Sequence, residues 1–327
     1  MNSSTSLAYV YGEWLPVCLE KYFLPAVLWP LLALVAVPLW IFFYIYLSVF
    51  IVLAYEISTK VKEETHKSCH FILGYLWDFF GRIWHGYEIH GIENLPDGPC
   101  LIIYYHAALP IDYIFFLARI FFLKNRLCCH TVVDRFVLKF PGLRMLSRNL
   151  KMMTGTKEEC LCALKNGDWV AIAPGGTREA IFSDETYKTI WGKRTGFAKV
   201  AIEARVPIIP MFTENSREGY RTLGRIRLLK NLYEYIRWPL IFLYGGFPVK
   251  WRTHVGQPIP YEPNITAEEL VEKAQNALQS LINKHQKLPA SIRRGLLERF
   301  HNKKKISKKH LPGYPLCSKC CTLMGSR

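Results

Sequence analysis

The chain has 327 residues, of which 50% are hydrophobic and 14% aromatic, and its formal net charge is +16 at neutral pH. The apolar fraction exceeds what a soluble domain of this length needs for its core, which argues against an ordinary soluble protein. There is no internal repeat, low-complexity segment or long linker, so repeat architectures are excluded as well. We expect one α/β domain of ordinary size and a membrane anchor.

A short N-terminal segment, residues 1–21, precedes an uncharged region at 22–55 that predicts membrane insertion. As one helix, these 34 residues would extend roughly 50 Å, whereas the hydrocarbon core of a bilayer is about 30 Å thick. Pro30 and Pro38 interrupt the region, so one tilted span and a helical hairpin both remain open. Lys60, Lys62 and Lys67 follow the region while Lys21 alone precedes it, which favours a cytosolic downstream domain.

Residues 64–86 are expected to form an amphipathic helix. Apolar side chains repeat at helical spacing from Ile72 to Trp84, with charged residues elsewhere around the turn. Such a helix either lies at the membrane surface or covers a sheet.

The region 87–287 alternates predicted strands and helices, which is typical of an α/β layered domain. The strands are expected near residues 100–105, 129–133, 169–173 and 207–212. The helices are expected near 110–123, 156–166 and 192–204, with a closing helix at about 267–286.

His106 and Asp112 follow the first of these strands and form a candidate catalytic pair. Six positions apart, they converge only if His106 precedes a helix that has Asp112 in its first turn. In that geometry Asp112 would orient the imidazole, and the other ring nitrogen would remove a proton from a hydroxyl. The alternative is a buried structural histidine and an aspartate that caps the helix.

A second candidate element is the Pro174–Glu179 block, which follows the strand at 169–173. Its Gly175, Gly176 and Thr177 are expected to form a turn whose N–H groups bind an anionic or carbonyl oxygen. Arg178 is able to hold a phosphate or a polar part of a substrate, or only to pair with Glu179 or Asp184.

The last 44 residues hold twelve lysines or arginines and a single acid, Glu298, so much of the net charge lies in the tail at 288–327. Contact with anionic lipid or plain solvation is preferred to nucleic-acid binding, because the sequence contains no recognisable nucleic-acid module. The ten cysteines lack disulfide-framework spacing, and Cys317, Cys320 and Cys321 form only half of a zinc motif. No metal site is predicted.

The order of these motifs resembles the glycerolipid acyltransferase superfamily, which includes glycerol-3-phosphate and lysophosphatidate acyltransferases. The resemblance spans about residues 84 to 285 and rests on Gly91–Pro96, His106 with Asp112, Pro174–Arg178 and Val206–Pro210. Trp84–Glu88, Ser183–Tyr187 and Tyr244–Lys250 are similar to a triacylglycerol-synthesising branch of that superfamily. The resemblance implies a glycerol-3-phosphate acyltransferase-like α/β fold with a central mixed sheet behind an N-terminal transmembrane anchor.

Two departures from the superfamily pattern touch the predicted site. Five residues instead of four separate His106 from Asp112, and the extra residue is expected in the loop before the helix. Gly175 stands where the superfamily has glutamate, which removes one carboxylate and makes a neutral acceptor more plausible than a phosphorylated one. Arg135 and Arg144 lie where relatives bind the acceptor, but the local match leaves their roles open.

The resemblance implies acyl transfer from acyl-CoA to the hydroxyl of mono- or diacylglycerol, toward triacylglycerol, at the cytosolic face of the endoplasmic reticulum membrane. His106 and Asp112 would be catalytic, while Gly175, Gly176, Thr177 and Arg178 would bind substrate. Acyl-CoA is then a co-substrate and no cofactor is expected. The alternatives are a lysophospholipid or lysophosphatidate acyltransferase and a non-catalytic lipid-binding protein with the same fold.

Overall fold

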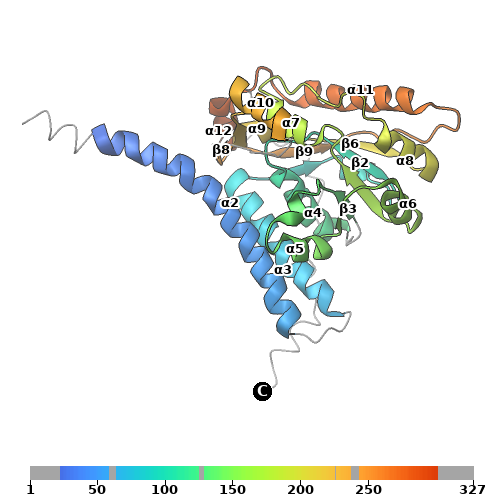
Figure 1. Cartoon of the computed structure of the whole chain (residues 1–327), viewed down its shortest axis with the longest axis horizontal. Helices are drawn as coiled ribbons and strands as arrows, with labels where there is room; N and C mark the ends of the chain where they lie inside the picture. Colours follow the sequence, from blue (N-terminus) through green and yellow to red (C-terminus); the bar gives the residue numbers. More distant parts are fainter. Residues whose placement is uncertain (1–22, 59–63, 125–128, 225, 237–242, 301–327) are drawn as a thin grey trace, which may run out of the picture.

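The computed structural model describes residues 23–58, 64–124, 129–224, 226–236 and 243–300. The predicted N-terminal segment, Lys60, Lys62 and the tail cysteines lie outside this part of the chain. Between the two alternatives for the apolar region, the structure has one continuous helix, α2 (Leu24–Ser58). Its N-terminal part extends away from the body of the protein, and its C-terminal part runs beside α3 (Figure 1). Its Leu39–Ile57 stretch has a mean hydropathy of 2.0 and is long enough to cross a membrane, and only 22% of that stretch is buried.

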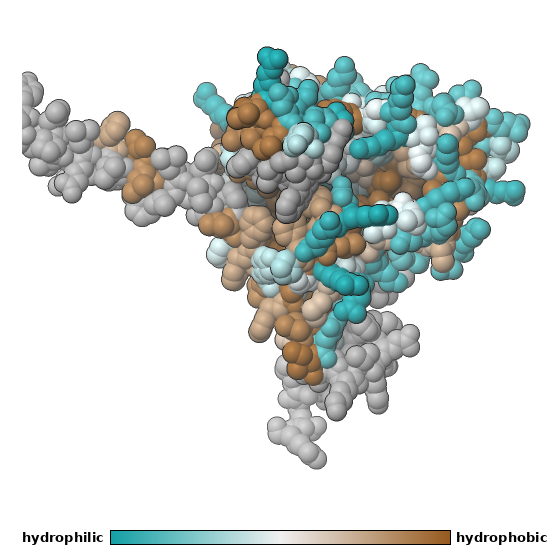
Figure 2. Space-filling view, viewed as in Figure 1, coloured by the Kyte–Doolittle hydropathy of each residue, from teal (hydrophilic) through white to brown (hydrophobic). Residues whose placement is uncertain are grey.

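The predicted amphipathic helix is present as α3 (Glu64–Phe80), continued by a π-helical turn, η2 (Gly81–His85). Leu73, Trp77 and Phe80 are buried against α2 and α4, whereas other members of the apolar stripe face outward. The exposed apolar side chains of α3 and η2 are Phe71, Ile72, Tyr75, Phe79 and Ile83. Apolar surface gathers over α3 and the adjoining part of α2, while the region around α6, α8 and α11 is mainly polar (Figure 2).

A seven-stranded mixed sheet forms the centre of the domain, as expected, in the order β1-β9-β6-β2-β5-β3-β4. All neighbouring strands are parallel except β6 and β9. The strands are β1 (Glu88–His90), β2 (Leu101–Tyr104), β3 (Cys129–Val132), β4 (Met152–Met153), β5 (Trp169–Ile172), β6 (Ile208–Glu214) and β9 (Arg252–Val255).

Helices cover both faces of this sheet, so the inner strands are apolar on both sides. Leu101 and Ile103 of β2 pack with α6 (Lys157–Lys165), α8 (Gly196–Ala204) and α11 (Ala267–His285). Ile102 and Tyr104 pack against α4 (Ile111–Lys124) on the opposite face. Capping boxes at Thr156 and Thr266 begin α6 and α11.

Shorter elements complete the described chain. They are η3 (Ile92–Asn94), η4 (Val137–Lys139), α5 (Leu143–Asn149), α7 (Gly176–Phe182), α9 (Ser216–Gly219), the β7 (Tyr220–Thr222) and β8 (Leu243–Gly245) pair, α10 (Arg227–Ile236) and α12 (Ile292–Phe300).

Helix α12 corrects the predicted start of the tail at residue 288. Gly295 packs closely enough that an added Cβ would lie 3.1 Å from Val249, and Arg299 donates to the Ile83 carbonyl at 2.9 Å. Glu298 is bound by Lys287 at 3.2 Å. These contacts make residues 288–300 part of the domain, and the rest of the predicted tail is outside the described residues.

Candidate active site

His106 lies just beyond the carboxyl end of β2, where the sequence predicted it, and its side chain is half-buried. Ring Nδ1 donates to the Ala107 carbonyl oxygen at 2.7 Å in the tautomer that makes this bond, which leaves Nε2 as a proton acceptor. Burial lowers the pKa of His106 below 6.5, and the charge of Arg217 lowers it further, against the opposing effect of the Ala107 bond. A general base requires a neutral imidazole in which one ring nitrogen is able to accept a proton.

Asp112 lies in the first turn of α4, as predicted, and is 4% exposed. Burial raises its pKa to about 6, opposed by a hydrogen bond from Thr213 of β6. Among the described residues, the hydrogen bonds of the His106 ring do not include Asp112, so the expected direct bond is replaced by the one to Ala107. In the loop after β2, the Ala107 carbonyl oxygen lies next to the imidazole ring and accepts the hydrogen bond from Nδ1. The Asp112 carboxyl group is instead hydrogen-bonded to Thr213.

Glu179 has a different position from the one that the sequence suggests. The sequence indicates only a pairing with Arg178, whereas in the structure Glu179 is fully buried beneath the His106 loop. Its Oε2 accepts the backbone N–H of His106 at 2.8 Å, and its Oε1 accepts that of Ile190 at 2.9 Å. Burial raises the pKa of Glu179 to about 7, against these two bonds. The carboxyl group therefore holds the backbone that carries the imidazole.

The two glycines of the Pro174–Glu179 block are required for different reasons. Gly176 has a φ of +52°, a left-handed conformation that favours glycine, and its N–H donates to the Ala173 carbonyl at 3.0 Å. Gly175 has an ordinary helical backbone, but an added Cβ would lie 2.5 Å from the Glu179 Cβ. The predicted turn is thus the N-terminus of α7, and the Gly176 N–H is already used within it.

Arg194 fixes this turn from the far side and was not predicted. Its Nη1 donates to the Pro174 and Gly175 carbonyl oxygens at 2.8 and 2.6 Å. Only a long loop separates Arg194 from α7 in the chain, and no spacing rule connects them. Its role could not be read from the sequence.

Thr177 and Arg178 both have protein partners in the structure. The Thr177 hydroxyl donates to Asp134 Oδ2 at 3.1 Å, and Arg178 pairs with Glu234 of α10 at 2.9 Å. Glu234 is a different partner from Glu179 and Asp184, the two that the sequence suggests. Its side chain is 43% exposed, so the pair lies at the surface of the site.

The two arginines left open by the sequence are both exposed, at different places. Arg135 directly follows Asp134, which bonds Thr177, so its backbone is close to the N-terminus of α7. Arg144 is in α5, a helix that packs on α2. Arg135 is therefore the better placed of the two.

A buried polar network supports α7 from below. Arg217 donates to the Ser183 hydroxyl at 2.7 Å, and Tyr105 and Ser183 share a hydrogen bond of 2.6 Å. Tyr187 donates to Glu218 at 2.5 Å and accepts the Arg217 N–H at 2.9 Å. Because these groups satisfy one another, the network is rigid, and it ties the strand before His106 to the helix that carries Glu179.

Comparison with known proteins identifies the family. The Acyltransferase family matches residues 86–214, which contain His106, Asp112 and the whole of α7. The fold is similar to the crystal structure of the 1-acyl-sn-glycerophosphate (LPA) acyltransferase PlsC from Thermotoga maritima, with a TM-score of 0.52 over 77% of this chain and 96% of that one. That sequence is 16% identical, so the likeness concerns the fold alone.

Closer relatives refine the assignment. A Gallus gallus protein is 50% identical over 311 residues, which make up 91% of this chain and 93% of the relative. A Homo sapiens protein is 49% identical over 306 residues, or 90% and 94% of the two chains. Both are named "DGAT1/2-independent enzyme synthesizing storage lipids". The chain therefore belongs to the acyltransferase family. The similarity to one branch of the family, predicted from the motifs, is confirmed at the level of sequence, and these relatives are named for the synthesis of storage lipids.

Proposed function

We propose that this chain is a membrane-bound O-acyltransferase that moves an acyl group from acyl-CoA to the hydroxyl of mono- or diacylglycerol, toward triacylglycerol. The observation that carries the proposal is the His106 imidazole, kept neutral by burial and bonded through Nδ1 to Ala107 at the edge of the sheet. Nε2 is then the atom that removes the proton of the acceptor hydroxyl.

The reaction needs one tetrahedral intermediate and no covalent acyl-enzyme. As Nε2 takes the proton, the hydroxyl oxygen attacks the thioester carbonyl carbon, and the carbonyl oxygen gains negative charge. The intermediate collapses by breaking the carbon–sulfur bond, and the CoA thiolate receives the proton from the imidazolium. The products are the ester and free CoA.

Asp112 and Glu179 support this step in different ways. With a pKa of about 6, Asp112 is mostly ionised at neutral pH and stabilises the imidazolium electrostatically. Glu179 is a positioning residue, because both of its oxygens accept backbone N–H groups. It keeps the His106 backbone in place while the ring gains and loses a proton.

The N-terminus of α7 is the proposed substrate-binding element. The first N–H groups of a helix have no intrahelical partner, and they favour negative charge. Because the Gly176 N–H is bonded to Ala173, the donors proposed for the oxyanion are the N–H groups of Gly175 and Thr177. Arg178 would exchange Glu234 for a phosphate of CoA or a polar group of the acceptor.

A neutral acceptor is supported by the names of the relatives, which refer to storage lipids. The replacement of the superfamily glutamate by Gly175 also supports a neutral acceptor, although the buried carboxyl group of Glu179 lies beside that position. We further propose that α2 anchors the enzyme in the endoplasmic reticulum membrane, with the catalytic domain on the cytosolic side, where acyl-CoA is found. No other cofactor is needed for this chemistry.

The test is a direct assay with the full chain, purified and inserted in nanodiscs. Labelled acyl-CoA is supplied with diacylglycerol, monoacylglycerol or a lysophospholipid in separate reactions. We expect neutral-lipid product that is lost in His106→Ala and kept in His130→Ala, which removes a histidine on β3 bonded to Asp168. Product from lysophospholipid alone would overturn the acceptor assignment, and product formation unchanged by His106→Ala would overturn the mechanism.

A further inference from the structure

Three strands at one edge of the main sheet align a group of charged and imidazole side chains. The register pairs Glu88 of β1 with Arg252 of β9 and Arg252 with Glu214 of β6. Two residues further along the strands, His90 of β1 lies opposite His254 of β9. Because residues opposite one another in a sheet share a face, these side chains form two neighbouring rows on the α11 face.

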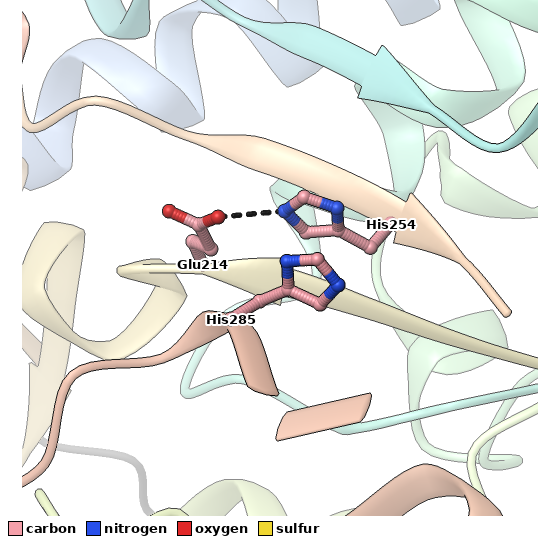
Figure 3. A group of neighbouring side chains, drawn as sticks. All are labelled: Glu214, His254 and His285. Carbon is pink, nitrogen blue, oxygen red and sulfur yellow. Dashed lines mark hydrogen bonds and ion pairs between the residues drawn. The ribbon is translucent and has the colours of Figure 1, made fainter. Parts of the chain in front are cut away.

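The C-terminal end of α11 adds a further imidazole to this group. His285 is the last residue of α11, and its ring stacks on that of His254 with a centroid distance of 3.6 Å and an interplanar angle of 16°. His254 Nε2 lies 2.6 Å from Glu214 Oε1, and nitrogens of both rings point toward the same carboxylate (Figure 3). Three elements distant in sequence therefore converge on one small volume.

We propose that Glu214, His254 and His285 bind one divalent transition-metal ion of the zinc class. Two imidazole nitrogens and a carboxylate oxygen are donors that suit zinc, and one donor atom from each residue lies within 4.8 Å of the other two. Zinc–ligand bonds of about 2.0–2.2 Å place tetrahedral donors roughly 3.5 Å apart, so shifts of about 1 Å bring these atoms to binding distance. Three protein ligands leave a fourth position for water.

The groups around Glu214 favour this role. Its second oxygen, Oε2, is held by Arg252 Nη1 at 3.1 Å, which leaves Oε1 directed at the histidines. Arg252 also contacts Glu298 at 3.5 Å and Glu88 at 3.6 Å, so its positive charge is balanced by three carboxylates. Partners that orient a ligand in this way commonly surround metal sites.

The same chain offers a matched histidine–carboxylate pair that lacks a third donor. His130 Nε2 lies 2.9 Å from Asp168 Oδ2, and this pair belongs to no three-ligand group among the described residues. A simple hydrogen bond explains the contact between His130 and Asp168. The stacked His285 distinguishes the Glu214 group, and a bound ion there would tie the end of α11 to the sheet edge.

The experiment is zinc titration of the untagged full-length protein in detergent, against a competing chelating dye. Cys317, Cys320 and Cys321 are replaced by serine throughout, because thiolates outside the site also bind zinc. We expect one ion per chain, an affinity at least about 100-fold weaker in Glu214→Gln and His285→Asn, and no change in His130→Asn. Zinc should raise the thermal midpoint of the parent protein and not that of the two ligand variants.

The absence of stoichiometric binding by the parent protein would overturn the proposal, as would equal affinity in the ligand variants. If a ligand variant fails to fold, cobalt binding to the parent protein decides instead. A tetrahedral spectrum without thiolate bands supports the nitrogen and oxygen ligands, and an octahedral or absent spectrum contradicts them. The readouts measure binding, so they are independent of the proposed acyl transfer.

Discussion

The side chain that Gly175 lacks would occupy the space that Glu179 fills. A Cβ at position 175 would lie 2.3 Å from Glu179 Cδ and 2.5 Å from its Cβ, and both distances are much shorter than a van der Waals contact. Glu179 in turn accepts the His106 N–H at 2.8 Å. The Gly175 position and the candidate general base are therefore linked through one buried carboxyl group.

We expect Gly175→Ala to lower both stability and activity. The new methyl group displaces Glu179 at its Cβ, which is fixed to the α7 backbone, so overpacking should cost about 1–3 kcal/mol. Gly196→Ala is the matched control, because a Cβ at the start of α8 meets nothing within 4 Å. Chemical unfolding in mild detergent, together with the acyl-transfer rate, measures both effects. Equal behaviour of the two variants would contradict the packing relationship.

Glu179→Gln should change how stability depends on pH. The pKa of Glu179 is about 7 in the folded protein and 4.5 ordinarily, so the folded state holds the proton more tightly and loses stability as pH rises from 4.5 through 7. The variant does not titrate, and relative to wild type it should gain up to about 3 kcal/mol across this window. A constant offset is also expected, because an amide has one acceptor oxygen for two N–H groups.

The measurement for Glu179 is the difference in unfolding free energy between the two proteins at several pH values, which cancels the titration of other groups. Glu234→Gln serves as the control, since Glu234 is partly exposed on α10 and pairs with Arg178. A difference that stays constant from pH 5 to pH 8 would show that Glu179 does not carry a raised pKa.

Asp112→Asn should remove one ionisation from the pH–rate profile. In wild type, the rate falls as pH drops through about 6, because Asp112 becomes protonated and no longer stabilises the imidazolium. In the variant, the rate should be lower by about 10²–10⁴-fold, and the Asp112 ionisation should be absent from its acidic limb. An unchanged limb near pH 6 would assign that ionisation to another group.

Variants of Arg178 and Glu234 distinguish a substrate-binding role of Arg178 from a purely structural ion pair. If Arg178 binds CoA or the acceptor, Arg178→Ala should raise KM, whereas Glu234→Gln should leave KM equal or lower because it releases the guanidinium. If the pair is only structural, the two variants should behave alike. Steady-state kinetics with acyl-CoA varied at fixed acceptor distinguish these outcomes.

Local sequence patterns were sufficient for most elements of the fold. Neighbouring residues alone identify several elements. The apolar runs indicate β2 and β5, the capping boxes indicate α6 and α11, and Pro110 indicates the start of α4. The sequence predicts a loop at Gly175 and Gly176. They begin a short helix, whose seven residues give too little periodicity to detect.

The parts of the site that were not predicted depend on contacts between distant segments. Glu179 reaches His106 across 73 residues, and Arg194 binds the α7 turn from a separate loop. Asp134 and Thr177 meet because β3 and β5 are neighbours in the sheet. A single sequence contains no signal for such pairs. The bond of Nδ1 to Ala107 was missed for another reason, since a backbone carbonyl has no sequence signature.

The central claim is that His106 is the general base for acylation of a neutral glycerolipid. It is tested most directly by the rate of triacylglycerol formation from labelled acyl-CoA and diacylglycerol in nanodiscs, with wild type, His106→Ala and His130→Ala compared at equal folded concentration. We predict that His106→Ala falls by at least about 100-fold while His130→Ala stays near wild type. Triacylglycerol formation by His106→Ala at the wild-type rate would contradict the account.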